Sequence, residues 1–165
     1  MCAKFVRTNP DLRAFVELDG CRFKRMFIVF SASLNGFILG CKKMLFVDET
    51  HLSESHKGTM LTVVALDVDN HTFDVVYAVV GRETNEDCLW SLTILHKCLG
   101  DLKLVIMSDR NQGLLVAMPH IFGAENHTYC VRHLTENLLT EAARLGIRRN
   151  VSKDLVKEIF NRVAY

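Results

Sequence analysis

The chain has 165 residues, of which 49% are hydrophobic and 24% charged, with a formal net charge of +1. This is long enough for one domain with a substantial core, and the balanced charge argues against a protein that binds nucleic acid by charge alone, though not against a local basic groove. The six cysteines are irregularly spaced, unlike a disulfide framework, no apolar run reaches the roughly 18 residues that span a membrane, and the start is too polar for a secretory signal.

Residues 1–40 are predicted to form an N-terminal helical lead-in, ahead of a core domain over residues 41–165. A basic and then apolar segment of this lead-in favours a helix through Phe27 and Phe30 that ends near Gly36.

Segments that are rich in β-branched residues and bounded by turn residues predict the strands of the core. They cover residues 44–48, 60–67, 73–80 and 103–108, and residues 128–131 add a short fifth strand. The turn residues at 69–71 join the second and third strands, so the first three strands are predicted to form an antiparallel meander.

Helical spacing and end signals predict four helices in the core. They cover residues 84–99, 112–118, 132–145 and 152–164. Thr84 is the expected N-cap of the first helix and Gly100 its stop, while Pro119 is expected to end the second. The order of elements predicts an α/β protein with a ribonuclease-H-like fold, a mixed five-stranded sheet flanked by helices. Other α/β folds differ from this order by only one crossover.

Two aspartates, Asp48 and Asp109, each come directly after an apolar run that is predicted to be a buried strand. Carboxylates in this position lie at the edge of a sheet, where α/β proteins build their sites. Phosphoryl transfer on nucleic acid uses divalent cations held by carboxylates, and Mg²⁺ needs few of them because it keeps several waters. Asp48 and Asp109 are therefore candidate catalytic residues and metal ligands, with capping of a turn as the alternative role for each.

Cys130 and His133 are three residues apart, a spacing at which both can bind one metal ion from a single helical turn. His127 adds a further candidate ligand. Structural Zn²⁺ normally takes four ligands, and no second pair is obvious nearby, so a buried cysteine and a histidine at a helix start are the alternative. Cys130 and His133 are kept as a candidate second metal or structural site, with Zn²⁺ as the ion.

Basic residues gather in two places in the sequence. Lys42 and Lys43 precede the first core strand, and a C-terminal set comprises Arg144, Arg148, Arg149, Lys153 and Lys157. Both groups could contact a phosphate backbone, but a solvated helix face is the default interpretation of such charges. The sequence therefore leaves the DNA-binding residues unassigned.

Several spaced motifs together resemble the transposase domain of Mutator-like elements (MULE), of plant type and related to the far-red-impaired-response family. The resemblance runs from about Cys21 to His133. It rests on Asp48-Glu49-Thr50-His51-Leu52, Ser108-Asp109-Arg110 and His127-Thr128-Tyr129-Cys130-Val131-Arg132-His133-Leu134, in this order. It implies a ribonuclease-H-like fold and a D-D-E site that uses Mg²⁺ or Mn²⁺ to cut and rejoin DNA. Asp48 and Asp109 match the first two acids of that site.

The chain departs from the family pattern at several positions. Glu49 replaces a glycine, Cys88 replaces a tryptophan, and the third acid has no motif to identify it. Candidates for the third acid are Glu136, Glu141 and Glu158.

The resemblance implies a DDE transposase core in the nucleus that acts on DNA, with a homo-oligomer as a candidate assembly and without a membrane or small-molecule cofactor. The core is expected to be C-terminally incomplete, a fragment or a decayed copy. The alternative is a non-catalytic domesticated domain that serves as a DNA-associated or transcription-regulatory interaction module.

Overall fold

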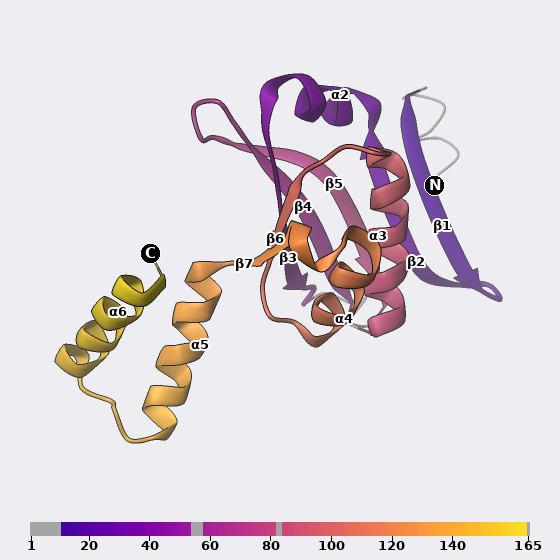
Figure 1. The fold of residues 1–165 in the computed structure, drawn as a ribbon. Coiled ribbons are helices and arrows are strands. Elements are labelled where there is room, and N and C mark those ends of the chain that lie inside the picture. The colour runs from indigo at the N-terminus through magenta and orange to yellow at the C-terminus, as the bar shows by residue number, and fades with distance from the viewer. Residues whose placement is uncertain (1–10, 54–57, 82–83, 165) are drawn as a thin grey trace. The chain divides into compact units, whose positions relative to one another are not determined.

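The computed structural model describes residues 11–53, 58–81 and 84–164, which form a mixed α/β protein (Figure 1). Its strands are β1 (Leu12–Asp19), β2 (Arg22–Phe30), β3 (Cys41–His51), β4 (Thr59–Asp67), β5 (Thr72–Val80), β6 (Val105–Ser108) and β7 (His127–Tyr129). Its helices are α2 (Ser31–Gly40), α3 (Asn85–Leu99), α4 (Gln112–Phe122), α5 (Val131–Arg144) and α6 (Asn150–Ala164), with a short 3₁₀ turn η1 (Ala124–Asn126).

The chain divides into two compact units, Met1–Thr128 and Tyr129–Tyr165, here called the sheet unit and the helical unit. Among the described helices, none has a stretch that is long and apolar enough to cross a bilayer.

The seven described strands form one mixed sheet in the order β1-β2-β5-β4-β3-β6-β7. β3, β4 and β5 make the predicted antiparallel meander, and β6 pairs with β3 in parallel. Alternate residues of β4, namely Leu61, Val63 and Ala65, are buried, while those between them are only partly covered. This period of two is typical of a strand with one well-covered face.

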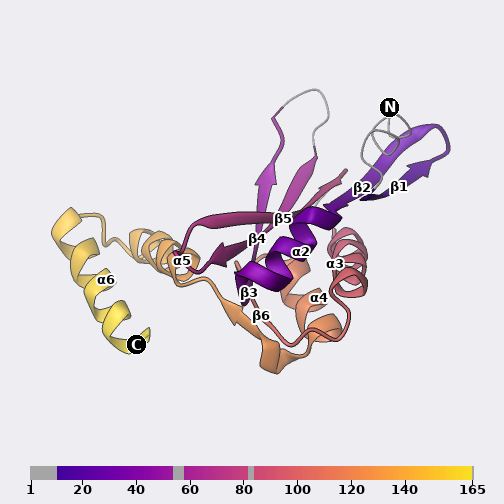
Figure 2. The same cartoon turned by 90° about the horizontal axis from the view of Figure 1, so that it is seen from above.

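Helices α3 and α4 lie together against the sheet, as both views show (Figures 1 and 2). Leucines of these helices share one core with the buried residues of the central strands. The fully buried members at this contact are Leu45, Leu92, Leu95, Ile106, Leu114 and Met118. The sheet unit therefore rests on apolar packing between a helical layer and one face of the sheet.

The predicted five-stranded sheet is wrong in its strand count, because β1 and β2 form a hairpin that adds two strands beside β5. Gly20, with φ of +58°, lies at the turn of this hairpin, where a residue without Cβ is favoured. The helix expected through Phe27 and Phe30 is the second half of β2 instead. Phe27 and Val29 are buried at alternate positions, as in a strand, and α2 begins only at Ser31.

The predicted ends of α3 are confirmed, whereas one end of α4 is not. Oγ1 of Thr84 accepts a hydrogen bond from the Asp87 N–H at 3.2 Å and donates one to the Asp87 carboxylate at 2.9 Å. Gly100 follows the helix with φ of +61°. α4 continues past Pro119, so the prediction that this proline ends it is wrong. The N–H of Gly123 still bonds to the carbonyl of Pro119 at 3.2 Å and closes the last turn.

The helical unit consists of α5 and α6, which contact each other. Its two helices are confirmed to within a few residues, and Gly146, with φ of +93°, lies in the turn between them. Ala142 is the one buried hydrophobic residue among the described residues of this unit. The unit therefore has little core of its own.

Candidate functional site

Asp48 and Asp109, far apart in the sequence, are brought to neighbouring strands. β3 and β6 run parallel, and their last paired residues are Val47 and Ser108. Each aspartate comes directly after its member of this pair. Neighbouring strands lie about 4.8 Å apart, so the two carboxylates occupy the same end of adjacent strands.

Asp48 lies on the less buried face of the sheet, and Asp109 comes directly after the end of β6. Val47 and Ser108 are 2% and 1% exposed and belong to the face that α3 and α4 cover. Since successive side chains of a strand alternate between faces, Asp48, which follows Val47 within β3, faces the other way. Asp48 and Asp109 are both half-buried.

The sequence predicted that the strand ends at Asp48, and this prediction is wrong. β3 continues to His51 and stays paired with β4, and Asp48 itself pairs with Thr62. The Thr62 hydroxyl donates to the carbonyl of Asp48 at 3.3 Å. What ends at Asp48 is the parallel pairing, because β6 stops at Ser108.

Asp109 shapes the turn that leads into α4. Its Oδ1 accepts a hydrogen bond from the N–H of Asn111 at 3.0 Å. Asn111 is in turn the N-cap of α4, and its side chain accepts from the N–H of Gly113 at 2.7 Å. The turn-capping alternative for Asp109 is thus observed. It leaves the metal role open, because a carboxylate has two oxygens with about four lone pairs.

Ser108 and His127 support the backbone of Asp109. The Ser108 hydroxyl donates to the Asp109 carbonyl at 2.9 Å and lies 2.9 Å from Nε2 of His127. A serine has one proton to donate, so Nε2–H of His127 is the donor in the second contact. Burial lowers the pKa of His127 and so favours the neutral imidazole, with its proton on Nε2. The sequence indicates His127 only as a candidate metal ligand, because its contact with Ser108, 19 residues away, depends on the fold.

The two departures from the family pattern, Glu49 and Cys88, contact each other. The thiol of Cys88 on α3 donates to Oε1 of Glu49 at 3.4 Å. Glu49 therefore faces α3, on the opposite side of β3 from Asp48. The carboxylate next to Asp48 in the sequence does not add a third acid to the Asp48–Asp109 site.

Cys130 and His133 both lie at the start of α5, in the helical unit. Cys130 is the N-cap residue, and its carbonyl accepts from the N–H of Leu134 at 3.0 Å. Nε2 of His133 lies 2.9 Å from the Arg132 guanidinium, which can only donate. The lone pair of that nitrogen is thereby engaged. A zinc site at Cys130 and His133 stays a prediction.

Comparison with known families identifies the domain. A model of the MULE transposase domain matches residues 44–137, more than half of the chain. The chain belongs to the MULE transposase domain family. The matched range contains both Asp48 and Asp109 as well as Cys130 and His133, and it leaves out β1, β2, α2 and α6. A search of curated proteins found no match to the chain.

No residue is assigned as the third acid of the D-D-E site that the resemblance implies. In the part of the chain that the structure describes, no three His, Cys, Asp or Glu side chains gather closely enough to hold a metal ion. The candidates Glu136, Glu141 and Glu158 are exposed on α5 and α6. Asp48 and Asp109 still fit Mg²⁺, because this ion binds through one or two carboxylates, substrate phosphates and several waters.

Proposed function

We propose that this MULE domain is the catalytic core of a DDE-type DNA transposase, in which Asp48 and Asp109 bind Mg²⁺ or Mn²⁺. The observation that carries the proposal is the position of these aspartates at the same end of the parallel strands β3 and β6. Membership of the family makes a transposase-related function and DNA as the partner the expected context.

We further propose that the sheet is a variant of the ribonuclease-H-like fold. The strand order β5-β4-β3-β6-β7, with an antiparallel meander followed by a parallel strand, supports this assignment. In this view β1 and β2 are an addition beside β5 that leaves the ends of β3 and β6 open. The site then lies where chain crossovers bring two strand ends together.

The residues around the aspartates would hold them in place for strand cleavage. Asp48 is fixed within the paired strand β3, and the hydrogen bond from Asn111 orients the Asp109 carboxylate. Ser108 and His127 hold the backbone behind it. When bound, a divalent cation supplies activation of the attacking water or 3′ hydroxyl and stabilises charge on the phosphate.

The proposal is tested by Mn²⁺-dependent nicking of a duplex DNA by the full chain. Asp109→Asn should lower the nicking rate by at least about 100-fold, because an amide replaces an anionic metal ligand. Its amide oxygen can still accept from Asn111, so the turn should persist and urea denaturation should show an unchanged midpoint.

Asp101→Asn is the matched control. Asp101 is exposed in the turn between α3 and β6, so the same chemical change should leave nicking unaffected. Equal nicking by wild type and Asp109→Asn would contradict the assignment of the site.

The second candidate is a non-catalytic, DNA-associated interaction module in the nucleus. It is favoured by the lack of a third acidic or other metal-binding group beside the two aspartates among the described residues. Titration of the wild-type chain with Mn²⁺ separates the two candidates. Tight binding at two ions per chain, lost in Asp109→Asn, would argue against the non-catalytic module.

A further inference from the structure

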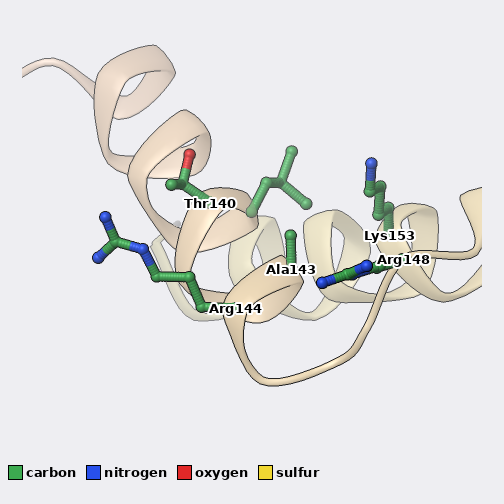
Figure 3. Close-up of a pocket in the computed structure, with 6 residues that line it drawn as sticks. Thr140, Ala143, Arg144, Arg148 and Lys153 are labelled. Carbon is green, nitrogen blue, oxygen red and sulfur yellow. The ribbon is translucent and has the colours of Figure 1, made fainter.

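A basic pocket lies in the helical unit, where α5 turns into α6 (Figure 3). It is lined by Leu139, Thr140, Ala143, Arg144, Arg148 and Lys153. Figure 3 shows Arg148 and Lys153 next to each other beside Ala143, while the guanidinium of Arg144 extends away from them. The pocket thus combines a small apolar floor with two adjacent cationic side chains.

Of the three cations that line this pocket, one has an acidic partner and two have none among the described residues. Arg144 is paired with Glu141 at 2.6 Å. Arg148 and Lys153 form no ion pair with any described residue. The hydroxyl of Thr140 already donates to a backbone carbonyl at 2.9 Å. The donors that the pocket offers to a ligand are therefore the N–H groups of Arg148 and Lys153.

The position of these cations in the fold also favours an anion. Arg148 and Arg149 directly precede α6 and Lys153 lies in its beginning, where the helix dipole is positive. No acidic residue lies in the first turn of α6 to offset this charge. Cations at this end repel the dipole, and a bound anion would relieve the repulsion.

The charge of the whole unit points to a polyanion. Residues 129–165 contain seven Lys or Arg and four Asp or Glu, a formal charge of +3. Residues 1–128 contain thirteen Lys or Arg and fifteen Asp or Glu, a formal charge of −2. The chain as a whole is therefore nearly neutral although its helical unit is basic.

We propose that Arg148 and Lys153 each bind a phosphate of the DNA backbone, at a contact outside the Asp48–Asp109 site. The choice of DNA as the polyanion rests on the proposed function. Arginine offers a planar fork to phosphate oxygens and lysine a point charge, and such contacts hold DNA without reading its sequence.

Fluorescence anisotropy with a labelled 30-base-pair duplex DNA tests this contact, in EDTA so that no metal site contributes. Arg148→Gln combined with Lys153→Gln should weaken binding about tenfold at low salt. The slope of log K against log salt should fall by about 1.8, since each phosphate contact contributes about 0.9.

The matched control is Lys157→Gln combined with Arg162→Gln, which removes the same charge from α6. Lys157 and Arg162 are already paired with Asp154 and Glu158, so binding should change by less than about twofold. Equal weakening by both double variants would overturn the proposal, since charge alone would then explain binding.

Two further outcomes also decide the matter. An unchanged affinity and salt slope in the pocket variant would overturn it. The proposal would also be overturned if the pocket variant lost affinity for a duplex RNA of the same length but kept its affinity for DNA. Binding in EDTA does not depend on nicking, so Asp109→Asn should bind DNA as wild type does even if the catalytic proposal fails.

Discussion

The sheet unit and the helical unit of this chain differ in how much apolar surface they bury and in their charge. Nearly all buried hydrophobic residues lie in the sheet unit, and Ala142 is the single described one in the helical unit. The helical unit instead exposes several large apolar side chains. These are Tyr129, Leu145, Val151, Leu155, Ile159 and Val163. Its charge is positive where that of the sheet unit is slightly negative.

This difference separates the roles that the two units can take. A densely packed sheet can hold two carboxylates at fixed positions, which a metal site needs. A helical pair with little core cannot position groups as precisely, but cationic side chains need less precision to contact a flexible phosphate backbone. We infer that precise chemistry belongs to the sheet unit and sequence-independent DNA contact to the helical unit.

The largest expected difference in stability is between the same leucine-to-alanine substitution made in the two units. Leu45 in β3 is fully buried, so Leu45→Ala should lower the free energy of unfolding by about 3 kcal/mol. Leu155 in α6 is 56% exposed, so Leu155→Ala should change it by less than about 0.5 kcal/mol. Urea denaturation measures both. Equal losses would mean that α6 is packed as tightly as β3.

A second matched pair compares ion pairs in the two units. The buried Arg25 contacts Glu17 at 2.7 Å and Asp87 at 3.0 Å, and lies 4.7 Å from the Trp90 ring centroid. Arg25→Met should cost about 2 kcal/mol of stability, since the buried Asp87 carboxylate loses its cation but keeps the Thr84 hydroxyl.

Arg162→Met is the partner of that test in the helical unit. Arg162 and Glu158 lie 2.8 Å apart but are both largely exposed to solvent. Such pairs contribute little, so stability should change by less than about 0.5 kcal/mol. A cost that matched that of Arg25→Met would show that the two ion pairs are equally shielded from water.

The sequence predicted those elements whose signals are local. Thr84 and Gly100 mark the ends of α3 by their own chemistry, and the meander follows from short β-branched runs separated by turns. The β1–β2 hairpin was missed because the apolar run through Phe27 fits a buried strand and a helix equally well. Only pairing with β5 decides between them.

The site depends on contacts that the sequence does not show directly. Asp48 and Asp109 come to the same end of neighbouring strands because β6 returns after α3 to pair in parallel with β3, so this placement follows from topology and not from sequence spacing. Arg148 and Lys153 were visible only as part of a basic run. Arg148, which follows the turn at Gly146, and Lys153 at the beginning of α6 line one pocket.

The smallest expected effect is a difference in acid sensitivity that originates in the sheet unit. Burial lowers the pKa of His127 in the folded state, so the unfolded chain takes up this proton first as the pH falls below about 6.5. The neutral His127 contributes its full stability above that pH and progressively less below it. His127→Gln should therefore lose less stability than wild type between pH 7.5 and pH 5.5, measured by urea denaturation at each pH. An identical loss in both proteins would show that His127 does not titrate differently on folding.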